Sequence, residues 1–176
     1  MTTKTRGIDF ENLSLKDALD LACLVEEEAE ERYLELVHQM EIHRTEDAGA
    51  FFKFMAGNEK KHGAELGARR TKLFGDAPRA VTRAMLFDIE APDYDEARAF
   101  MSPKEALLVA MRSEKKAYEF FDAALPHLKD AEVKALFEEL RAEEIHHQDL
   151  IAKELQKLPD GPSIPLDAFV DDPIQQ

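Results

Sequence analysis

Apolar residues recur at steps of three and four along four segments of the chain, which places them on one face of an α-helix in each segment. The segments cover about residues 15–42, 46–74, 103–124 and 131–158. Polar and charged residues fill the remaining faces, as expected for helices that pack against one another on one side and meet solvent on the other. The pattern therefore predicts an all-α protein, built as a four-helix bundle.

The ends of these segments carry residues that start or stop helices. Ser102, Pro103 and Glu105 form the clearest start, because serine caps, proline fits the first helical position and glutamate completes a capping box. Gly75, followed closely by Pro78, ends the second segment. Further start and stop signals are Ser14 with Asp17, Asp130, and Pro159.

Residues 76–102 form a connection that is longer than antiparallel neighbouring helices need. It contains a predicted short helix near residues 79–87. We expect this connection between the second and third helices to run the length of the bundle. Residues 1–13 are predicted to be an irregular lead, attached to the body by Ile8, Phe10 and Leu13.

Glutamate interrupts the apolar face of every predicted helix. The first and third helices carry one such residue each, and the second and fourth carry a Glu-x-x-His step, whose two side chains lie on the same helix face. These residues are Glu26 and Glu114, and the pairs Glu59–His62 and Glu143–His146.

The two halves of the chain repeat this arrangement. The first and third helices align without gaps and match Glu26 with Glu114, which distinguishes Glu26 from the other glutamates between residues 26 and 31. The second and fourth helices align in the same way and favour His146 over His147. A pairing of Glu143 with His147, four residues apart, stays open because helix phase alone does not exclude it.

Charges in the apolar face of a helix are costly unless they are paired or bind a metal ion. Four carboxylates brought together would repel one another, and two divalent cations would neutralise them. Carboxylate and imidazole ligands without thiolate suit iron or manganese, with zinc as an alternative. A glutamate on two helices and Glu-x-x-His on the other two is the pattern of dinuclear carboxylate proteins. The simpler interpretation, charges on solvated helix faces, does not explain the matched positions.

Composition and charge limit the class of protein. A chain of 176 residues is long enough for one domain, here residues 1–158, with an irregular C-terminal tail at 159–176. The net charge of -14 argues against a nucleic-acid partner. The single cysteine, Cys23, excludes an internal disulfide. Because neither a signal peptide nor a membrane-spanning stretch is recognisable, we expect a cytoplasmic protein without a membrane partner.

With these motifs, the chain resembles the ferritin-like diiron domain of rubrerythrins over its four helices. The resemblance implies that Glu26 and Glu114 are terminal ligands of two iron ions and that Glu59 and Glu143 bridge them. It also implies that His62 and His146 complete the ligand set and that Tyr33 lies beside it. Family members usually form homodimers, which is the expected oligomer.

Two departures from the family pattern bear on activity. Rubrerythrins usually carry a C-terminal rubredoxin, an iron bound by four cysteines, which this chain lacks. Many also have a further glutamate, tied to peroxide reduction, where this chain has Ala117. The resemblance therefore implies an oxidoreductase that reduces peroxide or dioxygen with an external electron donor protein. The alternatives are a ferroxidase that stores or delivers iron and a non-enzymatic, metal-stabilised helical module.

Overall fold

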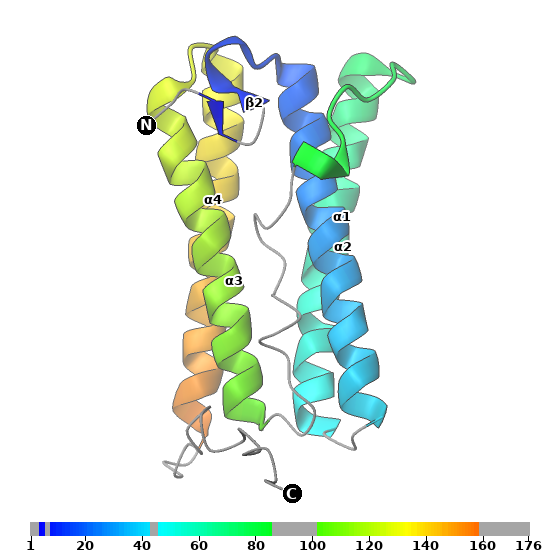
Figure 1. The fold of residues 1–176 in the computed structure, drawn as a ribbon, viewed down its shortest axis with the longest axis vertical. Helices are drawn as coiled ribbons and strands as arrows, with labels where there is room; N and C mark the ends of the chain where they lie inside the picture. The colour runs from blue at the N-terminus through cyan, green and yellow to red at the C-terminus, as the bar shows by residue number, and fades with distance from the viewer. Residues whose placement is uncertain (1–3, 6–7, 43–45, 86–101, 159–176) are drawn as a thin grey trace, which may run out of the picture.

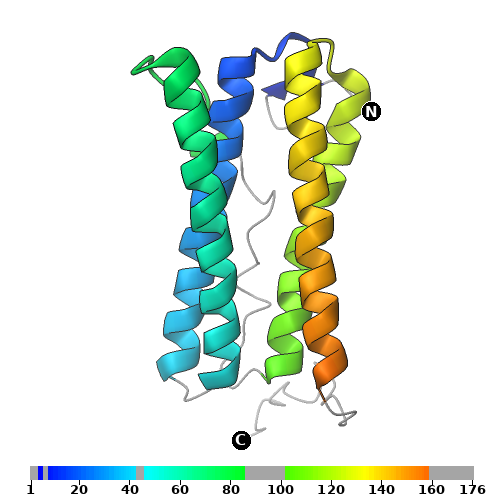
Figure 2. The same ribbon diagram turned by 180° about the vertical axis from the view of Figure 1, so that it is seen from behind.

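The computed structural model of the protein describes residues 4–5, 8–42, 46–85 and 102–158. Four long helices, which lie side by side along the long axis, form the body (Figures 1 and 2). They are α1 (Leu15–Ile42), α2 (Glu46–Phe74), α3 (Pro103–Ala124) and α4 (Ala131–Lys157). The predicted four-helix bundle is confirmed, and the helix ends agree with the sequence pattern to within a residue.

Side-chain caps explain why the helices begin where they do. Ser102 accepts a hydrogen bond from the Glu105 amide at 3.2 Å, while the Glu105 carboxylate accepts one from the Ser102 amide at 2.7 Å, so the capping box is formed. At the start of α4 the Asp130 carboxylate accepts hydrogen bonds from the amides of Glu132 and Val133, without a reciprocal bond among the described residues. Each cap contributes about 1 kcal/mol. Gly75 ends α2 with a φ of 56°, a conformation that favours glycine.

The lead is more regular than the sequence suggests. Strands β1 (Lys4–Thr5) and β2 (Ile8–Asp9) pair antiparallel, and a 3₁₀ turn follows at Phe10–Asn12. The predicted attachment is confirmed, because Ile8 and Phe10 are buried and Phe10 meets the rings of Phe120 and Phe137 edge-on.

The bundle consists of two helical hairpins, a first hairpin of α1 and α2 and a second hairpin of α3 and α4. The two helices within each hairpin contact each other extensively, whereas contacts between the hairpins are fewer. Helix α2 ends at the end of the bundle opposite to the one where α3 begins (Figure 1). The connection between them must therefore span the length of the bundle, as predicted.

Parts of the sequence-based expectations lie outside the described residues. Within the predicted short helix at 79–87, the described part holds a 3₁₀ turn at Arg83–Met85. Residues 86–101 and the tail at 159–176 are not described. No helix among the described residues is long and apolar enough to cross a membrane.

Two apolar clusters fill the interior, one toward each end of the bundle. The first cluster includes Leu21, Phe121 and Phe137, and the second includes Phe52 and Leu107. Every long helix contributes to both clusters, and buried polar residues lie between them: Glu26 on α1, Glu59 on α2, Glu114 on α3, and Glu144 with His147 on α4.

A buried ion pair joins α1 to the end of α2. The side chain of Asp20 is fully buried and accepts hydrogen bonds of 2.8 Å from Arg70 Nε and from Lys16 Nζ. Arg70 also donates to the carbonyl oxygens of Gly75 and Ala77, which follow α2. Burial pushes the pKa of Asp20 up, but the hydrogen bonds from Arg70 and Lys16 outweigh this effect and lower its pKa overall.

Candidate metal centre

A layer of carboxylates and imidazoles crosses the bundle between the two apolar clusters. From the first hairpin, Glu26 and Glu59 enter this layer with 3% and 1% of their surface exposed. His62, one turn after Glu59 on α2, is half-buried beside them. Close helix packing helps to place these groups, because a Cβ atom on Gly63 would lie only 3.3 Å from the Cβ atom of Glu26.

Glu114 of α3 is held from two sides. The Tyr33 hydroxyl donates a 2.8 Å hydrogen bond to its Oε1, and His147 Nδ1 lies 3.0 Å from its Oε2. Tyr33, Glu114 and His147 are all buried. The expectation that Tyr33 lies beside the candidate ligands is confirmed, and the carboxylate that it contacts is that of Glu114.

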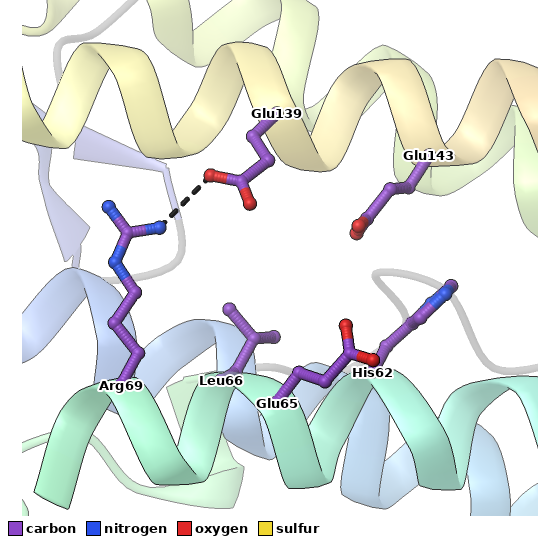
Figure 3. A pocket seen from close by; sticks show the side chains of 6 residues that line it. All are labelled: His62, Glu65, Leu66, Arg69, Glu139 and Glu143. Carbon is purple, nitrogen blue, oxygen red and sulfur yellow. Dashed lines mark hydrogen bonds and ion pairs between the residues drawn. The ribbon is translucent and has the colours of Figure 1, made fainter.

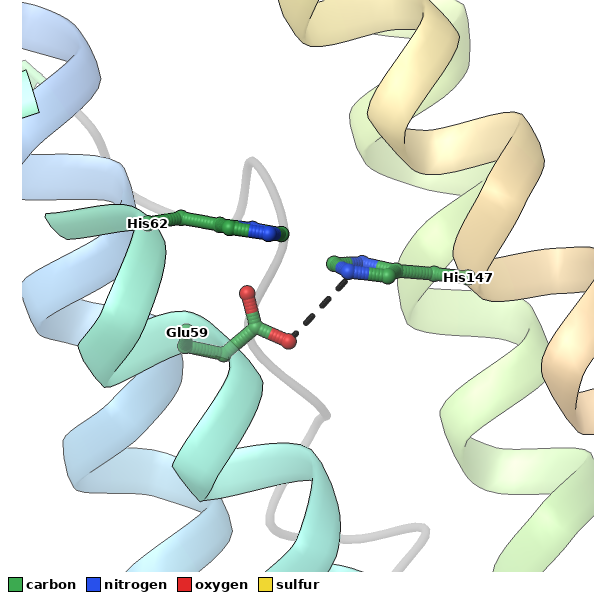
Figure 4. Close-up of side chains that lie close together, drawn as sticks. All are labelled: Glu59, His62 and His147. Atoms are coloured by element: carbon green, nitrogen blue, oxygen red, sulfur yellow. Dashed lines mark ion pairs between the residues drawn. The ribbon is translucent and has the colours of Figure 1, made fainter. Parts of the chain in front are cut away.

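His147 also faces the first hairpin. Its Nδ1 is 3.9 Å from Glu59 Oε1, and its ring is stacked on that of His62 with the ring centroids 5.1 Å apart and the planes tilted by only 7° (Figure 4). Glu59 lies beside this stack. The two hairpins therefore bring a carboxylate and two imidazoles together at the centre of the bundle.

The electrostatics of this layer are unfavourable without a cation. Burial raises the pKa of Glu59 well above its ordinary value, and the neighbouring carboxylates Glu114 and Glu26 raise it further. Burial lowers the pKa of His62, and the nearby His147 ring adds to this. Neither oxygen of Glu59 accepts a hydrogen bond within the described part of the chain, and Nδ1 of His62 is buried without a partner there. Buried donor atoms of this kind fit a metal ion.

Three groups of donor atoms could each hold a metal ion. In each group, one nitrogen or oxygen atom per residue lies within 4.8 Å of the others. The groups are Glu26–His62–Glu143, Glu114–Glu144–His147 and Glu59–His62–His147. The first two share no residue, and the third overlaps with both through its histidines. The donor set, carboxylate and imidazole without thiolate, fits two hard or borderline divalent cations.

The fourth helix is rotated relative to the sequence-based expectation. His146 is exposed and belongs to none of the three groups, so its expected inward position is wrong. Glu144 and His147 are buried instead. Glu143 is half-buried at the edge of the layer, and the pKa of its carboxyl is raised by burial and by Glu139.

Two overlapping motifs explain this error. The sequence from Glu143 to His147 contains Glu143-x-x-His146 and also Glu144-x-x-His147, and both satisfy the Glu-x-x-His spacing. Seven residues cover nearly two helical turns, so residues seven apart share a face. His147 lies seven residues after the buried Leu140, which in turn lies seven after the buried Val133. This spacing was the signal that could have identified His147, and with it Glu144.

Comparison with known proteins agrees with this architecture. The family model described as rubrerythrin matches residues 17–155, which cover α2 and α3 completely and α1 and α4 except for two residues at their outer ends. The chain belongs to the rubrerythrin family. Within this family the crossover four-helix bundle is the ferritin-like fold, so the predicted fold class is confirmed.

A solved structure supports the family assignment. It is the crystal structure of an uncharacterized conserved protein from Magnetospirillum magnetotacticum, 31% identical to this chain, with a TM-score of 0.66. The alignment covers 86% of this chain and 99% of that one. No curated protein matches the chain. The rubrerythrin-family fold implies a dinuclear metal site, and the carboxylate and histidine groups described above are the residues that could form it.

Proposed function

We propose that this rubrerythrin-family protein holds two redox-active metal ions, iron or manganese, and reduces peroxide or dioxygen with electrons from an external donor protein. The observation that carries the proposal is the set of three interlocking donor groups in the layer between the apolar clusters. Zinc would fit the same ligands but would not support redox chemistry.

The ligands divide into two positions. Glu26 and His62 would hold one ion and Glu114, Glu144 and His147 the other. Glu59 would contribute to holding the pair, because it shares a donor group with both histidines. The sequence-based ligands Glu26, Glu59, His62 and Glu114 thus stay in the proposal, while Glu144 and His147 replace the pair Glu143–His146.

When bound, the metal pair supplies two electrons, which with two protons convert hydrogen peroxide into two molecules of water. The chain's own residues prepare the site for this chemistry. Tyr33 fixes the orientation of Glu114 through its 2.8 Å hydrogen bond and holds a hydroxyl proton at the edge of the site. The apolar clusters on both sides exclude bulk water and strengthen the electrostatic interactions within the layer.

Ferrous-iron oxidation for storage or delivery is the second candidate. Ala117 favours it, because this fully buried residue offers no donor atom where many rubrerythrins have the glutamate tied to peroxide reduction. Repeated turnover of hydrogen peroxide by the iron-loaded protein with a chemical reductant would support the reductase. A single oxidation of iron that then stays bound would support the ferroxidase. No redox response with any metal would leave only a metal-stabilised module.

Metal content tests the site itself. After anaerobic loading with ferrous iron and removal of free metal, the wild-type chain should retain two ions. Glu59→Ala and Glu144→Ala should each retain clearly less, because both side chains lie in the buried donor layer. Unchanged stoichiometry in both variants would refute the proposed centre.

A further inference from the structure

Glu143 lies beside the buried layer but faces a different space. A cavity of about 70 Å³ opens between α2 and α4 and is lined by His62, Glu65, Leu66, Arg69, Glu139 and Glu143. In Figure 3, Glu143 extends from α4 toward α2, where His62 and Glu65 face it. His62 thus belongs both to this cavity and to the candidate metal centre.

Two of the three carboxylates that line this cavity have a basic partner. Arg69 Nη1 forms a 3.0 Å ion pair with Glu139 Oε2 (Figure 3), and Lys61 Nζ lies 3.9 Å from Glu65 Oε1. Glu143 has neither a hydrogen bond nor an ion pair with any residue in the described part of the chain. It is therefore the carboxylate of this cavity that is available to a cation.

Glu143 also reaches the donor layer. One of its oxygens lies within 4.8 Å of donor atoms of Glu26 and His62. A second observation at the same place points to a cation. Nδ1 of His62, which lines this cavity, is buried and has no hydrogen-bond partner within the described residues, and His62 shares a donor group with the buried and equally unpartnered carboxylate of Glu59.

The two metal positions differ in their access to solvent. All three residues of the Glu114–Glu144–His147 group are buried. In the other group only Glu26 is buried, while His62 and Glu143 are half-buried and line the cavity. The Glu26–His62–Glu143 group therefore lies against a cavity, whereas every residue of the Glu114–Glu144–His147 group is enclosed.

We propose that this cavity is the route by which a divalent cation enters and leaves the Glu26–His62 position, and that Glu143 carries the ion between the cavity and that position. The inference rests on the proposed dinuclear centre. A half-buried carboxylate can bind a partly hydrated ion and release it again at little cost, because water can replace the lost contact. The position at Glu114, Glu144 and His147 then keeps its ion much longer.

Cobalt(II) exchange tests this route without any assay of activity. The apo protein is loaded with two equivalents of Co²⁺, and release to an excess of chelator is followed by visible absorption. The wild type should release one ion quickly and the other slowly. Glu143→Gln should slow the loading of the fast ion and weaken its binding, each by about tenfold or more. The slow ion should be unchanged.

Glu139→Gln is the matched control. Glu139 lies one turn before Glu143 on the same helix and lines the same cavity, but it is paired with Arg69. This variant should behave like the wild type, and thermal unfolding of the apo proteins checks that all three are folded.

Three outcomes would overturn the inference alone. They are release of both ions at one rate in the wild type, equal effects of Glu143→Gln and Glu139→Gln on the fast ion, and binding of two ions in every variant with unchanged kinetics. Failure of the wild type to bind two ions would instead overturn the proposed dinuclear centre itself, and with it this inference.

Discussion

Two buried carboxylates in the first hairpin have opposite surroundings. Asp20 meets Arg70 and Lys16, so the cations that neutralise it are part of the chain. Glu59 is equally buried, but among the described residues neither lysine nor arginine forms an ion pair with it, and its neighbours include Glu26 and Glu114. The pKa of Asp20 is lowered and that of Glu59 is raised. The charge of Asp20 is thus neutralised by residues of the chain itself, whereas that of Glu59 would be neutralised only by a cation from solution.

Removing the built-in cation should have the largest effect on stability. Arg70→Met leaves Asp20 buried with only Lys16 and removes the hydrogen bonds to Gly75 and Ala77. We expect a loss of about 3 kcal/mol in the free energy of unfolding, measured by urea denaturation of the apo protein. Arg69→Met, which removes an exposed ion pair with Glu139, should cost less than about 1 kcal/mol. Similar losses in the two variants would contradict the contrast.

The pH dependence of stability should follow Asp20 in the acid range. Because its pKa in the folded protein is below the ordinary value of 3.8, its ionised form stabilises the fold above that pH. This contribution is lost as the pH falls through the lowered pKa. Asp20→Asn should therefore be about 2 kcal/mol less stable than the wild type at neutral pH, and the difference should shrink in acid. A difference that stayed constant down to low pH would rule out this linkage.

Removing the charge of Glu59 should have the opposite effect on stability from removing the charge of Asp20. A carboxyl whose pKa is raised in the folded state destabilises the fold once the pH exceeds its ordinary pKa of 4.5. Glu59→Gln should therefore stabilise the apo protein at neutral pH by about 1 kcal/mol and reduce its metal content. Thermal unfolding with and without added metal measures both effects. Destabilisation of the apo protein would show that Glu59 has a structural partner.

The smallest effect is expected at His146. Because this side chain is exposed, His146→Ala should change stability by less than about 0.5 kcal/mol and leave metal content unchanged. His147→Ala should lower the metal content, since His147 lies between Glu59 and Glu114. Metal analysis of the two variants distinguishes the helix phase in the structure from the one that the repeat suggested.

Most of the bundle could be predicted from the sequence, because its signals are local. Caps such as Ser102 and the end signal at Gly75 act within one turn of the chain, so they define helix ends without knowledge of the partners. The glutamates in the first three helices were recognisable since each is a lone charge in an apolar face. The chain from Glu143 to His147 offers two acidic and two imidazole residues in succession, and there the packing of α4 against α3 decides which pair turns inward.

The cavity, the role of Glu143 and the Asp20–Arg70 pair depend on tertiary contacts. Asp20 and Arg70 lie on different helices, fifty positions apart in the sequence, and no local spacing links them. Tyr33 was expected near the ligands from its position after Glu26, yet the carboxylate that it contacts belongs to the other hairpin. Such partners follow from the register between helices, which short motifs do not encode.

Because the two hairpins make few contacts with each other, metal binding between them can contribute much of the free energy that holds them together. Glu59 and His62 come from one hairpin and His147 from the other, so a single ion held by these residues would cross-link the two halves. Whatever free energy this binding releases is added to the free energy that keeps the hairpins together. At a free metal concentration one hundred times the dissociation constant, this amounts to about 2.7 kcal/mol. The supply of metal ions in the surroundings would then determine how firmly the two halves of the bundle are joined.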